Sequence, residues 1–153
     1  MGFDFVLWSW LTFTLPIQQQ KLPQQPVDSK KEIKIEQKTG VASFYHNKFE
    51  GRKTATGEVF DNDKYTAASN HFKLGTYVKV TNQSNGKMVY VKVNDRMGHQ
   101  GRMIDLAEVA AQDLKFIARG TTKVKIEQVS VAEGKKQILA QKAGEQPKLK
   151  NEL

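Results

Sequence analysis

The chain has 153 residues, which is enough for one domain with flanking segments. It contains no Cys, and this excludes disulfides, thiol catalysis, cysteine-based zinc sites and attachment of a lipid to cysteine. A formal net charge of +8 favours an acidic partner, such as nucleic acid, an anionic membrane surface or an acidic wall polymer. Its Lys and Arg residues are spread along the chain without a basic block or stripe, so we expect no nucleic-acid partner.

Both ends of the chain are expected to lie outside the domain core. Residues 1–15 include an apolar run of the length of a signal-peptide core, and they predict a signal-like or anchor segment and hence export. No Lys or Arg precedes the run and no Ala-x-Ala site follows it, which leaves a misassigned start as the alternative. Residues 16–38 are rich in Gln, Pro and Lys and predict a linker. Residues 131–153 predict a polar, flexible tail, with a short helix around residues 136–142 as the alternative.

Between residues 39 and 130 the hydrophobic period is mostly two, which predicts β-strands. Residues 76–81 and 87–93 alternate, and Ser84-Asn85-Gly86 between them predicts a hairpin. Several short strands with one helix favour a mainly β fold, a small closed barrel, over a parallel α/β sheet. The remaining strand candidates are residues 41–45, 58–60, 65–68 and 122–129.

One helix is expected among these strands. Its apolar residues recur at helical spacing: Leu106, Val109, Ala110, Leu114 and Ile117. Asp105 and Glu108 resemble a capping box at its start, and Gly120 lies just past its end. We therefore expect Asp105 to act first as a helix cap.

Two carboxylates, Asp95 and Glu58, suggest a catalytic site. If the strand keeps its alternation, Asp95 lies on the same face as Val91 and Val93. Partial desolvation on an apolar face favours the protonated carboxyl, which a general acid at a glycosidic oxygen requires. Glu58 follows a turn, and paired carboxylates on a β scaffold are the usual apparatus for breaking glycosidic bonds. The alternative is a turn at residues 94–96 in which Asp95 accepts backbone hydrogen bonds, with Glu58 as a solvated charge.

Other kinds of site are not indicated. His46, His71 and His99 lack metal-ligand spacing, so we expect neither a metal nor a cofactor. No P-loop, dinucleotide-binding fingerprint or nucleophile elbow occurs. Phe44 and Tyr45 offer ring faces to a sugar, although aromatic residues in a strand more commonly belong to a core.

A series of motifs occurs in order over about residues 39–129. The motifs are Thr39-Gly-Val-Ala-Ser-Phe-Tyr45, Phe49-Glu-Gly-Arg-Lys-Thr-Ala-Thr-Gly-Glu58, Tyr65-Thr-Ala-Ala68, Leu74-Gly-Thr76, Val80-Thr-Asn82, Asn85-Gly86, Val93-Asn-Asp-Arg96 and Gly101-Arg-Met-Ile-Asp-Leu106. Together they resemble the bacterial rare lipoprotein A family of septal-ring lytic transglycosylases. The resemblance implies a six-stranded double-psi β-barrel catalytic domain at residues 39–130, a fold shared with expansins and some endoglucanases.

The resemblance also implies an activity. A member of this family is an enzyme of the periplasm or cell envelope. It cleaves the bond between N-acetylmuramic acid and N-acetylglucosamine in peptidoglycan, leaves 1,6-anhydro ends, and prefers strands without stem peptides. We expect a monomer that can meet septal or envelope proteins. Because Cys is absent, the lipid anchor of the family name is not expected here.

Site residues carry over position by position. The family's catalytic aspartate falls on Asp95 and its glutamate on Glu58. Its histidine, directly after the Thr-Ala-Ala run, is replaced by Ser69, while His71 follows one strand repeat later. We expect Ser69, His71, Tyr45 and Arg96 to bind substrate.

Two features depart from the family. Besides Ser69, the segment Met97-Gly98-His99 stands where Gly-Pro-Phe is more usual. These departures keep open a non-catalytic, expansin-like barrel that binds peptidoglycan. A further alternative is inverting hydrolysis by Asp95 and Glu58.

Overall fold

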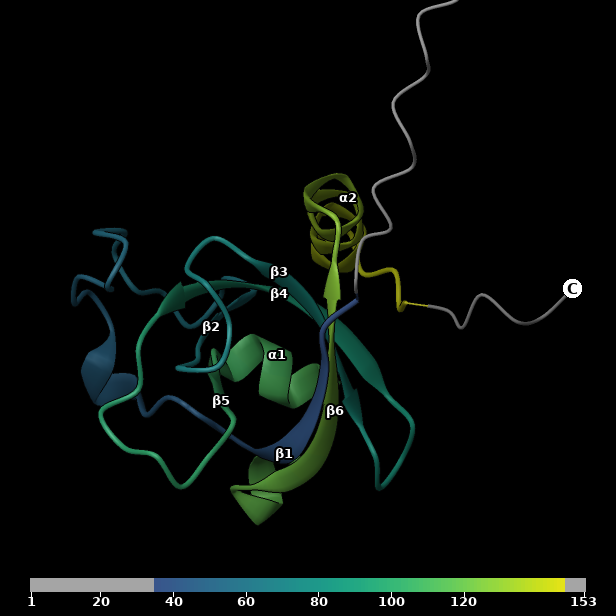
Figure 1. The fold of residues 1–153 in the computed structure, drawn as a ribbon, viewed down its shortest axis with the longest axis horizontal. Helices are drawn as coiled ribbons and strands as arrows, with labels where there is room; N and C mark the ends of the chain where they lie inside the picture. The colour runs from purple at the N-terminus through teal and green to yellow at the C-terminus, as the bar shows by residue number, and fades with distance from the viewer. Residues whose placement is uncertain (1–34, 148–153) are drawn as a thin grey trace, which may run out of the picture. The chain divides into compact units, whose positions relative to one another are not determined.

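The computed structural model describes residues 35–147, and the structural statements below concern this part of the chain. The apolar segment at residues 1–15 and nearly all of the predicted linker lie outside it. Strands close into a barrel in the order β1-β5-β2-β4-β3-β6 (Figure 1). Their bounds are β1 Gln37–Phe44, β2 Thr66–Ala68, β3 Tyr77–Asn82, β4 Met88–Asp95, β5 Ile104–Leu106 and β6 Thr122–Val129.

The hairpin of β3 and β4 is the strand pair that the sequence predicts most directly. Val78 pairs with Val91 and Val80 with Val89 across an antiparallel ladder. Gly86 has a φ of 71°, a left-handed conformation that glycine adopts without steric cost. The turn therefore fixes the register that places these valines inside the barrel.

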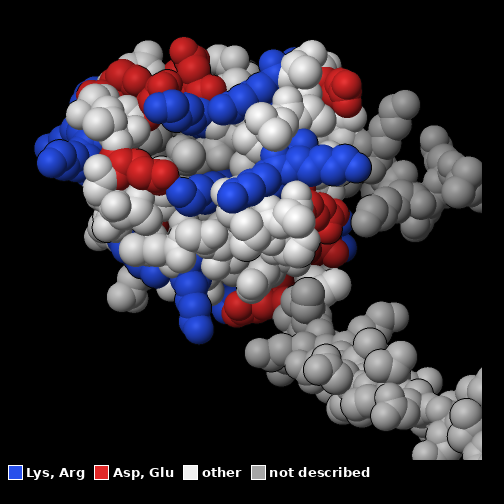
Figure 2. Space-filling model, turned by 90° about the horizontal axis from the view of Figure 1, so that it is seen from above, with Lys and Arg blue, Asp and Glu red and all other residues white. Residues whose placement is uncertain are grey.

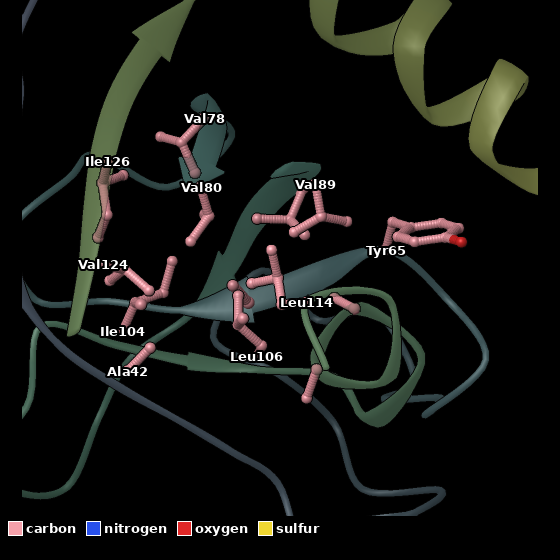
Figure 3. Close-up of a cluster of buried hydrophobic side chains, with 14 of the residues drawn as sticks. Ala42, Tyr65, Val78, Val80, Val89, Ile104, Leu106, Leu114, Val124 and Ile126 are labelled. Atoms are coloured by element: carbon pink, nitrogen blue, oxygen red, sulfur yellow. The ribbon is translucent and has the colours of Figure 1, made fainter. Parts of the chain in front are cut away.

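One hydrophobic core fills the barrel and extends to the helix after β5 (Figure 3). β6 closes the ring, because it pairs with β3 on one side and with β1 on the other. The strands point β-branched and other apolar side chains inward at every second position, which is the pattern that the sequence shows. Its fully buried members include Val78, Val80, Val89, Val91, Val93, Ile104, Leu106, Leu114, Val124 and Ile126.

The segment from Ile104 onward differs from the expected helix. Residues Ile104–Leu106 form β5, because each neighbouring strand pairs with them and buries Ile104 and Leu106. The helix α1 is shorter, Glu108–Asp113, and a 3₁₀ helix follows at Ile117–Arg119. Ala107 is the N-cap residue of α1 and makes no side-chain cap hydrogen bond. The capping role predicted for Asp105 is therefore wrong.

Residues 58–60 also differ from expectation, because they form no strand. Lys53 and Val59 make one isolated antiparallel bridge across a tight loop. The loop turns at Gly57, whose φ of 84° lies in the left-handed region. Thr54–Glu58 thus forms a turn beside the barrel, and this turn becomes important for the site.

Helix α2, Val131–Lys142, occupies part of the segment expected to be a flexible tail. Ser130 caps it by accepting a hydrogen bond from the Glu133 N–H at 3.1 Å. Near its end, the buried amide of Gln141 accepts from the Tyr90 N–H at 2.6 Å and donates to the Tyr90 carbonyl at 2.9 Å. Burying both backbone groups against a matching amide secures α2 to β4. Within residues 35–147, no helix is long and apolar enough to cross a membrane.

The outer surface carries charges of both signs. Figure 2 views the molecule from above, the side of Figure 1 on which α2 lies, and shows Lys and Arg side chains with Asp and Glu beside them. Ion pairs account for some of this mixture, including Lys79 with Glu127 at 2.8 Å. Such mixing is typical of a solvated surface.

Replacing Gly134 by Ala is expected to destabilise the protein, although Ala is the better helix former. A Cβ at Gly134 would lie 2.4 Å from the Tyr77 Cβ, which belongs to β3. Overpacking costs about 1–3 kcal/mol, which exceeds the gain of up to ~1 kcal/mol in helix propensity. Chemical denaturation should show the loss, whereas Lys136→Ala on the exposed side of the same helix should change stability little. A more stable Gly134→Ala variant would contradict this packing.

Candidate active site

A cleft of about 840 Å³ opens beside the barrel where β4 ends. The segment after β1 and the segment between β4 and β5 form its walls. Aromatic rings and cations dominate the lining, and two carboxylates join them. Its lining residues are Phe44, Tyr45, His46, Lys48, Phe49, Arg52, Lys53, Phe60, Asp95, Arg96, Met97, Gly98, His99, Arg102 and Asp105.

Asp95 is the carboxylate that the sequence predicts to be catalytic, and it lines this cleft. The pairing of β2 with β4 shifts by one residue, so that Ala67 faces Val93 and Ala68 faces Asp95. This irregularity ends the regular alternation just before Asp95, whose side chain is half-buried in the cleft instead of enclosed in the core.

Three donors fix the Asp95 carboxyl. Its Oδ1 accepts the backbone N–H groups of Ala55 at 2.9 Å and Arg96 at 2.8 Å. Its Oδ2 accepts the Tyr45 hydroxyl at 2.9 Å. Oδ1 is thus held by two backbone donors, while Oδ2 has a single side-chain donor. Oδ2 is therefore the oxygen that is better placed to exchange a proton with a molecule in the cleft.

Tyr45 works as a permanent donor to Asp95. Burial raises the pKa of its hydroxyl far above the usual value, and the hydrogen bond to Asp95 and the charges of Asp95 and Asp105 act in the same direction. The ring packs against Phe60, at 4.4 Å between centroids, and against Phe49 at 5.7 Å. Tyr45 thus joins the aromatic wall of the cleft to its carboxylate.

Glu58 lies outside the residues that line the cleft. Its Oε1 pairs with Lys92 Nζ at 2.8 Å, and its Oε2 accepts from Asn94 at 2.9 Å and Thr56 at 3.0 Å. The hydrogen bond from Lys92, followed by that from Asn94, lowers the pKa of Glu58 from 4.5 to about 2. Glu58 is therefore ionised at neutral pH and cannot donate a proton there. Its contacts instead tie the Thr54–Glu58 turn to β4, next to the Ala55 N–H that binds Asp95.

Replacing Glu58 by Gln is expected to lower glycan cleavage by about tenfold or less, because Gln keeps one oxygen for the turn. A direct role in catalysis would cost on the order of 10²–10⁴-fold. Lys92→Met removes the same ion pair by changing the cation, and it should lower cleavage to a similar extent. Since its pKa is lowered, wild-type Glu58 contributes stability above its ordinary pKa of 4.5 that is lost as the pH falls toward about 2. Acid titration of Glu58→Gln should lack that contribution, and Lys92→Met should lose the part that depends on Lys92.

Of the other predicted substrate-binding residues, the structure places Arg96 in the cleft lining but not Ser69 or His71. Ser69 is fully buried, and its hydroxyl donates to the Met103 carbonyl at 2.8 Å. His71 is exposed and, like Ser69, is not among the residues that line the cleft. Arg96 does line it, but its guanidinium donates to the backbone carbonyls of Ser69 and, at 2.7 Å, Phe72. Asp95, Tyr45 and Arg96 therefore come together, whereas Glu58, Ser69 and His71 do not join them.

A second carboxylate, Asp105, lies in the cleft, whereas the sequence predicts it first as a helix cap and only second as a substrate contact. It accepts a hydrogen bond from the buried Ser43 hydroxyl and forms an ion pair with Arg102, Nε to Oδ1, at 3.1 Å. His99 Nε2 lies 3.3 Å from Asp105 Oδ2 and also contacts the Arg102 guanidinium. The signal that could have placed Asp105 here is strand alternation, because buried Ile104 and Leu106 flank it.

The arrangement supports acid–base chemistry on a polar ligand. The cleft offers a fixed carboxyl, an aromatic wall and several cations. Among residues 35–147, no group of His, Asp or Glu is arranged to hold a metal ion. Proton transfer through side chains is the chemistry that these residues can perform directly.

Comparison with known proteins adds the family. Residues 37–126 match the lytic transglycolase family. The chain is 50% identical over 92 residues to the endolytic peptidoglycan transglycosylase RlpA of Neisseria meningitidis serogroup A, covering 60% of this chain and 38% of the relative. It is 44% identical over 93 residues to RlpA of Pasteurella multocida, covering 60% of this chain and 32% of the relative. The chain thus spans only about a third of the length of these relatives.

A solved structure is also similar. The Streptomyces papain inhibitor superposes with a TM-score of 0.51 at 24% identity, covering 62% of this chain and 96% of the inhibitor. This likeness shows the fold alone, and it agrees with the closed six-stranded barrel. Since the family match covers well over half of the sequence, the chain belongs to the lytic transglycolase family of double-psi β-barrels, as its resemblance to rare lipoprotein A proteins predicts.

Proposed function

We propose that the protein is a lytic transglycosylase that cleaves peptidoglycan glycan strands between N-acetylmuramic acid and N-acetylglucosamine. The observation that carries the proposal is the Asp95 carboxyl, held in the cleft by three donors with Oδ2 the less occupied oxygen. The family match and the relatives named as endolytic peptidoglycan transglycosylases support it.

In the proposed reaction, protonated Asp95 donates its proton to the oxygen leaving C1 of N-acetylmuramic acid. The C1–oxygen bond breaks through a state with oxocarbenium character. The C6 hydroxyl of the same sugar forms the new bond to C1 and loses its proton, which in the simplest route returns to Asp95. No water is consumed, and the product ends in a 1,6-anhydro ring.

The cleft supports a preference for strands without stem peptides. In such strands each N-acetylmuramic acid has a free lactyl carboxylate, so the polymer carries negative charge close to its sugar rings. Lys48, Arg52 and Lys53 line the cleft and match that charge. Phe49 and Tyr45 supply ring faces against which sugars pack.

This function implies a place in the cell envelope. Peptidoglycan lies outside the cytoplasmic membrane, so we infer that the protein is exported and acts in the periplasm or cell envelope, in wall remodelling and cell separation. We further infer that it acts as a monomer and can meet septal or envelope proteins there.

A second candidate function is a non-catalytic barrel that binds peptidoglycan, as in expansin-like proteins. The observation in its favour is Ser69, which stands at the position of the family histidine and buries its hydroxyl against the Met103 carbonyl. Inverting hydrolysis by Asp95 and Glu58 has less support, because Glu58 pairs with Lys92 outside the cleft lining.

One experiment distinguishes the lytic transglycosylase from the non-catalytic barrel. The full chain is incubated with insoluble peptidoglycan, intact or with stem peptides removed by an amidase, and both released fragments and bound protein are measured. The proposed enzyme releases soluble fragments and releases more from the stripped strands. Binding without released fragments would instead favour the non-catalytic barrel.

A further inference from the structure

The barrel register places a second acid–base unit opposite Asp95. Ala68 in β2 pairs with Asp95 of β4 on one side and with Asp105 of β5 on the other. Two strand spacings put the Cα atoms of these aspartates roughly 9–10 Å apart. Both carboxylates line the cleft, while Ala68 between them is buried and short. A sugar ring in the cleft can therefore meet a different group on each side.

Asp105 is fixed in a position from which it contacts His99. Its side chain is only 12% exposed and is fixed by Ser43 and Arg102, whereas the His99 side chain is 43% exposed in the cleft wall. Such a buried, oriented carboxylate beside a half-exposed imidazole is the arrangement that orients a histidine for proton transfer.

The nitrogen His99 Nε2 lies between a donor and an acceptor. The Arg102 guanidinium, a donor, contacts it on one side, and Asp105 Oδ2, an acceptor, lies 3.3 Å away on the other. The neutral tautomer that carries its proton on Nε2 donates to Asp105 Oδ2 and leaves Nδ1 as the acceptor. The imidazolium keeps the same bond to Asp105, so Asp105 orients the ring in both protonation states while Nδ1 takes up and releases a proton.

The other histidines are not placed in this way. His46 lines the cleft, but its Nδ1 accepts the Lys48 N–H at 3.2 Å, and it caps the 3₁₀ helix Asn47–Phe49. His71 is exposed and does not line the cleft. Only His99, among the histidines of the described chain, combines a place in the cleft with a carboxylate partner.

We propose that His99, oriented by Asp105, is the base that takes the proton of the C6 hydroxyl, an inference that rests on the proposed function. Asp95 then gives its proton to the leaving oxygen, the C1–oxygen bond breaks, and O6 bonds to C1 while its proton passes to His99. The pair ends as Asp95 carboxylate and His99 imidazolium. Release of one proton from His99 to solvent and uptake of one by Asp95 restore the starting state.

If Asp95 is the acid and His99 the base, the rate of cleavage depends on pH. His99 must be neutral to accept a proton, and a histidine side chain typically changes charge between pH 5 and 8. Cleavage by the wild type should therefore decline as the pH falls through that range. The charged groups in contact with His99 are Asp105 and Arg102. The other charged or titratable groups of the cleft are Tyr45, His46, Lys48, Arg52 and Lys53 after β1, and Asp95 and Arg96 at the end of β4.

The test compares full-length wild type, His99→Gln, His99→Ala and the control His71→Gln on stripped glycan strands across pH 5 to 8. We expect His99→Gln to lower kcat by on the order of 10²-fold near pH 8 with little change in KM, and to lose the decline at low pH. Added imidazole should restore part of the activity of His99→Ala. His71→Gln should behave as the wild type does.

Outcomes separate this inference from the proposed function. Wild-type kcat and pH dependence in His99→Gln would overturn the role of His99 while leaving the function standing. A rise in KM alone, with no rescue by imidazole, would make His99 a binding residue and also overturn it. If the wild type releases no fragments at any pH, the proposed function fails and this inference fails with it.

Discussion

Replacing Asp95 by Asn is expected to lower glycan cleavage by on the order of 10²–10⁴-fold while the fold stays unchanged. Asn cannot give up a proton to a leaving oxygen, so the general acid is lost. Apart from this proton, Asn can keep the hydrogen bonds that Asp95 makes. Its amide oxygen can accept the N–H groups of Ala55 and Arg96, and its amide NH₂ can donate to the Tyr45 hydroxyl oxygen.

The measurement combines initial rates on stripped glycan strands with thermal unfolding and with binding to insoluble peptidoglycan. Unchanged unfolding and binding would show that the loss belongs to the chemical step. Asp95→Ala is the poorer test, because it removes the acceptors of two backbone N–H groups. Cleavage by Asp95→Asn at the wild-type rate would refute the assignment of Asp95 as the acid.

Tyr45→Phe is expected to lower cleavage by roughly 10–100-fold, because a hydrogen bond to a charged group contributes about 1.5–3 kcal/mol. The variant keeps the ring that packs on Phe60 and Phe49 and loses only the hydroxyl that orients Asp95 Oδ2. Since Oδ2 is the oxygen proposed to carry the proton, kcat should fall more than KM rises.

The structure offers a matched control in Tyr65. Its hydroxyl also donates to a carboxylate, Asp113 Oδ2 at 2.7 Å, and its pKa is likewise raised by burial first and by Asp113 second. Tyr65 does not line the cleft. Tyr65→Phe should therefore reduce stability to a similar extent and leave kcat nearly unchanged. Equal losses of kcat in both variants would mean that Tyr45 acts only through stability.

Much of the barrel could be predicted because local signals and burial agree. In β3, β4 and β6, β-branched residues recur at every second position, and the turn before Gly86 fixes the hairpin. The short strand β5 was hidden, because Leu106 and the apolar residues after it also fit a helical period. Its identity depends on parallel pairing with β1, which links residues 62 positions apart, such as Ser43 and Asp105.

In the site, too, residues in local motifs could be predicted, and residues placed by long-range contacts could not. Asp95, Tyr45 and Arg96 belong to motifs whose spacing the family shares, and the structure brings them together in the cleft. The alternation of buried Ile104 and Leu106 could have placed Asp105 in a strand, but its position near Asp95 depends on the strand order, and the position of His99 depends on a loop. For helix α2, only the second half was expected, and only as the alternative to a flexible tail, because its docking depends on long-range contacts such as those of Gln141 with the backbone of Tyr90.

In the proposed reaction, the cleft around Asp95 breaks the glycan without using water. The most direct test is mass spectrometry of the fragments that the protein releases from stripped glycan strands. We expect fragments with 1,6-anhydro ends, each lighter by one water than the hydrolysed fragment of the same length, and no fragments from Asp95→Asn. Fragments with reducing ends would contradict it and would show hydrolysis instead.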